Sequence, residues 1–192
     1  MSTSYTLENI RKEKATMQLL WIGMVSICMF FAGLTSLVFV DNMEIPSDSD
    51  WFLYSTVIVL FSSLVYLIVS RNIKRDKPVS FLIFMVFILG LIFTYCQFQG
   101  WSDMRNNYGI IFTGENPETG QATPKEHSYF YAITVAHFAH LIFGLIALFI
   151  TFFNALRNKY SSKKVLGIKL AGTYWHFLTI LWVYIYLFIN YT

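Results

Sequence analysis

Five long apolar runs dominate the pattern of hydrophobic and polar positions along the chain. They lie near residues 17–40, 52–70, 79–99, 128–153 and 171–190, and none of them contains Asp, Glu, Lys or Arg. About 20 apolar residues suffice for a helix to cross a hydrocarbon core about 30 Å thick. Because backbone groups in lipid must be paired within their own segment, the pattern predicts an all-α integral membrane protein, a bundle of five transmembrane helices.

The connections between these runs alternate in charge. The first, "DNMEIPSDSD", is acidic, whereas "RNIKRDKP" and "RNKYSSKK" are basic. By the positive-inside rule, this alternation predicts a cytoplasmic N-terminus and an external C-terminus. No connection is long enough for a second folded unit, so we expect residues 1–192 to form a single membrane domain. The longest connection, rich in Gly, Asn, Thr and Pro, predicts an irregular external loop over 100–127.

Small and polar residues recur at helical spacing within the runs. His137, His140 and Gly144 share a face in the fourth run, and His176 and Thr179 share one in the fifth. Helices in lipid associate through small side chains and hydrogen bonds. We therefore predict that these faces point at protein, where the three histidines and Thr179 hydrogen-bond across the packed helices.

Composition narrows the class of protein. The chain is 56% hydrophobic and 13% charged, which argues against a water-soluble domain. Its net charge of +3 reflects the basic connections and indicates no nucleic-acid surface. Trp51 and Trp101 stand at run ends, as in an interfacial aromatic belt. Cys28 and Cys96 lie in different runs at different depths, so we expect neither a disulfide nor a cysteine metal site.

The histidines are the main candidates for chemistry, because neutral imidazole is the commonest metal ligand and a pair could hold a haem. His140 is expected near mid-bilayer and His176 near the inner start of its run. At about 1.5 Å of rise per residue they differ by on the order of 10 Å in height, which suits one haem poorly. His137 and His140 have no carboxylate or thiolate beside them in the run. We expect packing residues and no catalytic, cofactor or metal site.

Two functions of other classes stay open at this point. A b-type haem membrane anchor would use the histidines as ligands. A small independent transporter would be expected to carry ionisable residues in its spans, and histidine is the only candidate type in these runs. The residues themselves best fit an accessory membrane subunit without an active site of its own.

Four segments resemble, in order and spacing, subunit III of the haem-copper oxidases, which are the cytochrome c and quinol oxidases. They are "WIGMVSICMFFAGL", "CQFQGW", "VAHFAHLIFG" and "AGTYWHFLTILWVYIY". The likeness extends from Trp21 to the end of the chain. Its most specific part is the Tyr-Trp-His-Phe run over 174–177, followed by Trp182. The chain is similar to the short, five-span form of this family.

The resemblance implies an accessory, non-catalytic subunit of a respiratory haem-copper terminal oxidase of the cytochrome c oxidase type, in a bacterial inner membrane. It implies that haem and copper reside in partner subunits, that this chain holds no cofactor, and that phospholipid is bound. Expected partners are oxidase subunit I directly, subunits II and IV, and a larger respiratory supercomplex. A nitric oxide reductase-like complex is the alternative assembly. The structural, interface or lipid-facing candidates are Gln97, Trp101, His137, His140, Gly144, Trp175, His176, Thr179 and Trp182.

The chain departs from the family pattern at four positions that usually carry an acid. They are occupied by Ile27, Gly100, Lys169 and Thr179. Their identity argues against a carboxylate-based role in proton buffering and indicates a divergent branch of the family.

Overall fold

The computed structural model describes residues 2–40, 49–108, 125–161 and 164–191. Within these ranges it contains five helices, each long and apolar enough to cross a membrane. The helices are α1 (Ser2–Val40), α2 (Asp50–Ile73), α3 (Ser80–Tyr108), α4 (Lys125–Leu156) and α5 (Leu166–Tyr191). The predicted all-α bundle of five membrane helices is confirmed.

Two helices extend beyond their apolar runs. α3 continues through Gly100 and Trp101 to Tyr108, and α4 already begins at Lys125. The prediction of an irregular loop over 100–127 was therefore wrong at both ends, and residues 109–124 lie outside the described ranges. The apolar pattern stops where the hydrocarbon would stop, whereas a helix can continue into the polar layer; there Asn106 donates to the Ser102 hydroxyl one turn earlier at 3.4 Å.

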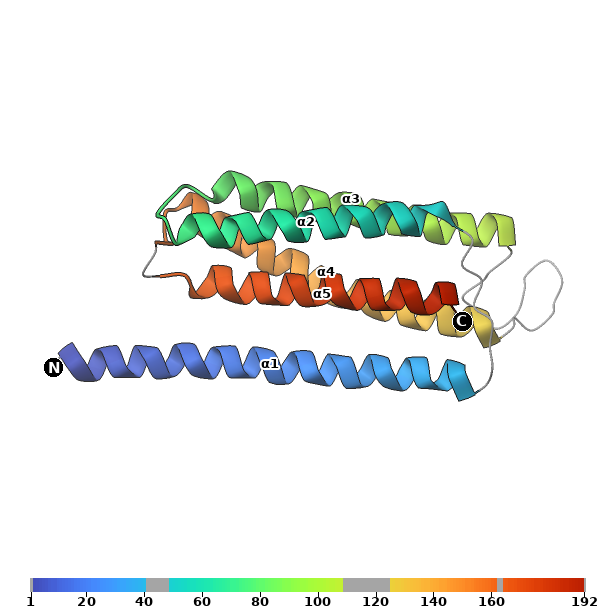
Figure 1. Ribbon diagram of the computed structural model, residues 1–192, viewed down its shortest axis with the longest axis horizontal. Helices are drawn as coiled ribbons and strands as arrows, with labels where there is room; N and C mark the ends of the chain where they lie inside the picture. Colours follow the sequence, from blue (N-terminus) through green and yellow to red (C-terminus); the bar gives the residue numbers. More distant parts are fainter. Residues whose placement is uncertain (1, 41–48, 109–124, 162–163, 192) are drawn as a thin grey trace.

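The helices form a ring of four with a fifth on its outside. α2, α3, α4 and α5 each pack on the next, and α5 closes the ring on α2. α1 packs only on α4 and α5 among the described helices. Successive helices alternate in direction, so the N-terminus and both basic connections lie at one end and the C-terminus at the other (Figure 1).

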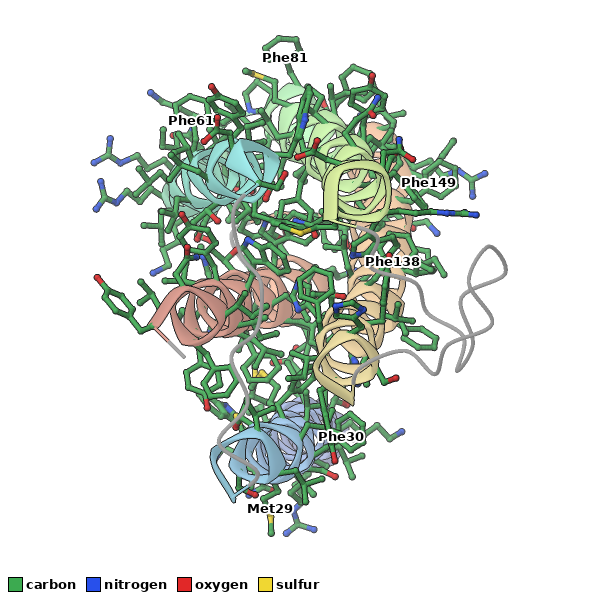
Figure 2. The ribbon with its side chains drawn as sticks, turned by 90° about the vertical axis from the view of Figure 1, so that its right-hand side faces the viewer. Met29, Phe30, Phe61, Phe81, Phe138 and Phe149 are labelled. Carbon is green, nitrogen blue, oxygen red and sulfur yellow. The ribbon has the colours of Figure 1, made fainter. Side chains whose placement is uncertain are left out.

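Large apolar side chains cover the outside of the bundle. Phe61, Phe81 and Phe149 point away from it on α2, α3 and α4, and Met29 on α1 points away from the other four helices (Figure 2). Phe81 is 70% exposed and Met29 is 72% exposed. These surfaces suit contact with lipid or with apolar partner helices.

Candidate functional site

The interior of the ring is organised by hydroxyl groups on α2. Ser55 and Thr56 recur seven residues later as Ser62 and Ser63, so two turns bring the same pattern to the same face. Ser55, Thr56 and Ser62 are buried, and each hydroxyl donates to a carbonyl of its own helix at 2.7–2.8 Å. Their oxygens can then accept a hydrogen bond from a neighbouring helix. We call these four side chains the α2 hydroxyl seam.

Two indoles of α5 donate to this seam. The Trp175 Nε1–H donates to Ser62 Oγ at 3.0 Å, and the Trp182 Nε1–H donates to Thr56 Oγ1 at 3.0 Å. Both indoles are 1% exposed, and they lie seven residues apart on one face of α5. The donors are seven residues apart on α5 and their acceptors are six residues apart on the antiparallel α2, so the two bonds together fix the register of the helices.

Two further side chains form hydrogen bonds with the seam, Gln97 of α3 and His176 of α5. Gln97 of α3, which is 2% exposed, donates from Nε2 to Ser55 Oγ at 2.9 Å. His176 of α5 has its Nδ1 2.6 Å from Ser63 Oγ. Intramembrane hydrogen bonds of this kind contribute about 0.6 kcal/mol each on average, so their larger effect here is to select one register.

Glycines let the helices approach the indoles. A Cβ on Gly90 of α3 would lie 2.8 Å from Trp175 Cη2, and one on Gly144 of α4 would lie 3.4 Å from Trp175 Cε3. Gly172 of α5 packs in the same way against the ring of Tyr66, whose hydroxyl donates to a carbonyl of α5. Trp175 therefore fills a junction that all four helices of the ring share.

The three intramembrane histidines face three different neighbours. His137 lies against Trp182, with ring centroids 5.1 Å apart, and its Nδ1 has no hydrogen-bond partner among the described residues. His140 donates from Nδ1 to the carbonyl one turn earlier in α4 at 2.7 Å, and its ring meets the edge of Phe31 on α1. Of the three intramembrane histidines and Thr179, only His176 bonds to another helix through its side chain in the described structure.

The height difference between His140 and His176 is smaller than the sequence predicted. His137 lies beside Trp182, and a Cβ on Gly144 would meet Leu178 at 2.7 Å, so α4 and α5 run antiparallel in a clear register. In that register the two histidines are separated by about four residues, or about 6 Å at 1.5 Å per residue, instead of about 10 Å. The prediction counted from the ends of the apolar runs, and α4 is longer than its run.

No metal-ligand cluster appears in the described ranges. No group of three His, Cys, Asp or Glu side chains lies close enough together there to hold an ion. The direction of the imidazoles gives the physical reason, since His140 turns toward α1 while His176 turns toward α2.

Trp101 belongs to a separate aromatic cluster near the C-terminal end of α3. Its ring lies 5.5 Å from both Phe98 and Phe138, and Phe138 sits between α3 and α4 (Figure 2). Its buried Nε1 has no partner in the described residues. Trp101 is thus half-buried in a helix junction and is not connected to the α2 hydroxyl seam through any bond given by the structure.

The four positions without an acid differ in their surroundings. A Cβ on Gly100 would meet the Phe52 ring at 2.7 Å, so a longer side chain could fit there only if that ring moved. Thr179 is 2% exposed, and its hydroxyl donates to the Trp175 carbonyl at 3.0 Å. Ile27 is half-buried on α1, and Lys169 is exposed. A carboxylate at position 100 would therefore require movement of the Phe52 ring, and one at position 179 would replace a buried hydroxyl that bonds to its own helix.

The sequence reasoning missed the α2 hydroxyl seam. Polar faces were predicted in the fourth and fifth runs, where the histidines and Gly144 stand out, and the second run was described only as apolar. The signal was the pair of adjacent hydroxyls repeated at an interval of seven residues.

Comparison with known proteins places this architecture among oxidase subunits. A family model described as cytochrome c oxidase subunit III matches residues 33–192. Subunit 3 of the cytochrome bo(3) ubiquinol oxidase of Buchnera aphidicola from Acyrthosiphon pisum is 26% identical over 198 residues, covering 98% of this chain and 91% of the relative. Cytochrome c oxidase subunit 3 of Spodoptera frugiperda is 30% identical over 105 residues, covering 55% of this chain and 63% of the relative. The probable cytochrome c oxidase subunit 3 of Rickettsia conorii is 38% identical over 64 residues, covering 32% of this chain and 23% of the relative.

Proposed function

The chain belongs to the cytochrome c oxidase subunit III family of the haem-copper oxidases, and on that premise we propose that it is an accessory subunit that stabilises the catalytic subunit I. It is a multi-pass protein of the bacterial inner membrane and part of a respiratory terminal oxidase, an oxidoreductase complex. In this proposal, reduction of O2 to water takes place in the neighbouring subunit, which holds the haem and copper. Subunits II and IV and a respiratory supercomplex are further partners under the same proposal.

One observation about the site carries this proposal. Several described intramembrane polar groups hold α2, α3 and α5 to one another, as in the bonds of Gln97, Trp175 and Trp182 to the α2 hydroxyl seam. The outside of the bundle is apolar and broad, which suits packing against another membrane subunit. Such an arrangement supports a rigid scaffold in which His137, His140, His176 and Thr179 are packing residues.

Purification through a tag on this chain tests the assembly. After extraction in a mild detergent, a haem-copper catalytic subunit should co-purify, and its haem should appear in the absorption spectrum of the complex. The chain expressed alone should show no Soret band, which separates the accessory role from a b-type haem anchor. Purification without a haem-copper subunit would refute the proposal, and a nitric oxide reductase subunit in its place would support the alternative assembly.

For the electron donor we propose cytochrome c, in line with the description of the matching family model. A quinol is the second candidate, because the relative aligned along almost the whole chain is a ubiquinol oxidase subunit. The purified complex should oxidise reduced cytochrome c and leave a short-chain ubiquinol unoxidised. The opposite preference would replace cytochrome c by the quinol in this proposal.

For orientation we propose a cytoplasmic N-terminus and an external C-terminus within one membrane domain. The support is that the turns at Lys74–Lys77 and Arg157–Lys159 lie at the same end of the bundle as the N-terminus. Reporter fusions that are active only outside the cytoplasm should give a signal at the C-terminus and none in the α2–α3 turn.

A further inference from the structure

A cavity of about 240 Å³ lies at the basic end of the bundle, between the turn that joins α2 to α3 and the end of α4. Its polar lining comes from Asp76, Lys77, Ser80, Asn158 and Tyr160. At about 30 Å³ per water molecule this space equals about eight waters. It therefore suits a small polar group and is too small for a whole organic cofactor.

Both walls of the cavity are built by the same kind of helix ending. Asp76 and Asn158 adopt left-handed backbone conformations, with φ of 51° and 50°. The N–H groups of the following residues, Lys77 and Lys159, each return to a carbonyl five residues earlier at 3.1 Å. This is the Schellman pattern, which closes a helix C-terminus with a defined turn. The cavity walls are thus fixed by backbone bonds.

The two turns that carry the cavity are rich in basic residues, although its lining itself holds one lysine, Lys77, and one carboxylate, Asp76. In the described parts of 71–80 and 155–169 there are four basic residues in each stretch, against Asp76 as the single acidic residue. The cavity also borders Ser80, where α3 begins, and the first N–H groups of a helix carry partial positive charge. The basic side chains and the N-terminus of α3 both favour binding of an anion over binding of a cation in this cavity.

The cavity lies at the depth of lipid headgroups. Gly100 of α3 packs on Phe52 of α2, so Trp51 and Trp101 lie at the same level, where the aromatic-belt pattern of the sequence predicts one membrane boundary. About 20 residues of helix span the hydrocarbon core, which places the opposite boundary near residue 81 of α3. Ser80 and the cavity beside it are therefore at the second boundary, where lipid phosphates lie.

We propose that this cavity binds a phosphate-bearing anion, with Lys77 as its charge partner and the side chains of Ser80, Asn158 and Tyr160 as hydrogen-bond donors. The ring of Tyr160 is held at the cavity by its close fit on Gly167, where a Cβ would meet the hydroxyl at 2.5 Å. The Asp76 carboxylate also lines the cavity and opposes an anion. Phosphate of an anionic phospholipid and free phosphate share this chemistry.

Native mass spectrometry of the tagged full-length chain, with the subunits that co-purify, tests this site. The probes are phosphatidylglycerol, phosphatidylcholine and inorganic phosphate. Lys77→Gln should weaken the tightest phosphatidylglycerol binding about fivefold, which corresponds to about 1 kcal/mol per lysine near a membrane surface. Lys74→Gln is the matched control, because Lys74 is exposed in the same turn and does not line the cavity.

A second variant acts in the opposite direction. Asp76→Asn removes the opposing charge and keeps a residue type that tolerates the left-handed conformation, so it should strengthen phosphatidylglycerol binding. Displacement of the lipid by inorganic phosphate would identify free phosphate as the occupant, and no displacement would identify the lipid. Equal weakening by Lys77→Gln and Lys74→Gln, no effect of either, or equal binding of phosphatidylcholine would overturn the proposal. Because Lys77→Gln should leave co-purification of partner subunits unchanged, the outcome is separate from that of the assembly role.

Discussion

Gly172→Ala tests whether α5 and α2 are in rigid contact. A Cβ at this position would lie 2.9 Å from Cδ1 of Tyr66 and closer still to Cε1. Carbon atoms prefer a separation of about 3.5–4.0 Å, so the phenol ring would have to move. It is fully buried, and its hydroxyl donates to the Ile168 carbonyl at 2.9 Å, so any movement breaks a buried hydrogen bond.

The size of the effect follows from three contributions. Overpacking a filled core costs about 1–3 kcal/mol. Loss of the Tyr66 hydrogen bond costs about 0.5–1.5 kcal/mol. Alanine is the better helix former by about 1 kcal/mol, which opposes the other two contributions. Gly172→Ala should therefore lower the free energy of unfolding by about 0.5–3.5 kcal/mol.

Gly33→Ala is the control, because a Cβ at Gly33 on α1 would have nothing within 4 Å. Only the helix-propensity gain remains there, so this variant should be more stable than the parent by up to about 1 kcal/mol. Unfolding of each variant by sodium dodecyl sulfate in mixed micelles, followed by circular dichroism, gives the free energies. In a Tyr66→Leu background the penalty of Gly172→Ala should shrink, since the two sites are in contact. If Gly172→Ala and Gly33→Ala stabilise the protein equally, the rigid contact does not exist.

The remaining predictions concern the polar side chains of the interior. Thr56→Val leaves the Trp182 indole N–H unpaired and should lower the free energy of unfolding by about 1–3 kcal/mol in the same assay. Thr56→Ser keeps the hydroxyl and should recover most of this loss. Equal free energies for the two variants would contradict the hydrogen bond. His176→Leu breaks a bond to α2 and should weaken retention of this subunit by its complex. His137→Leu, at an imidazole whose Nδ1 has no partner in the described part of the chain, should leave co-purification near normal; the reverse order would count against these assignments. Thr179→Asp buries a carboxylate and should destabilise the chain by about 3–5 kcal/mol if the charge stays unpaired. Thr179→Val removes only a hydrogen bond and should destabilise it by about 1 kcal/mol. Similar expression and thermal stability of the two variants would reveal a partner for the acid.

Much of the fold could be predicted from the sequence, because the number of spans depends only on charge-free length. The choice of neighbours could not. His137 and His140 share a face by spacing, yet one imidazole turns to Trp182 and the other to α1, since side chains three residues apart diverge by about 60° around a helix. Periodicity fixes a face, but the partner of that face depends on how distant helices pack.

The partners of the α2 hydroxyl seam could not be predicted from the sequence either. Ser62 and Trp175 are 113 residues apart in the chain, and nothing local to either marks the other as its partner. Their pairing depends on two spacings taken together, seven residues between the indoles on α5 and six residues between the hydroxyls on α2. Neither spacing identifies the partner helix when it is read within its own run.

The position of α1 outside the ring sets an order for biogenesis. α2 and α3 are neighbours in the chain and pack together, so this pair can form as soon as both have been inserted. α1 is made first but packs on α4 and α5, which are made last, so it must wait in the bilayer until the rest of the chain has been synthesised. A ribosome stalled before α5 would leave the first helix without half of its contact surface, and nascent chains arrested there should be the ones that membrane quality control recognises.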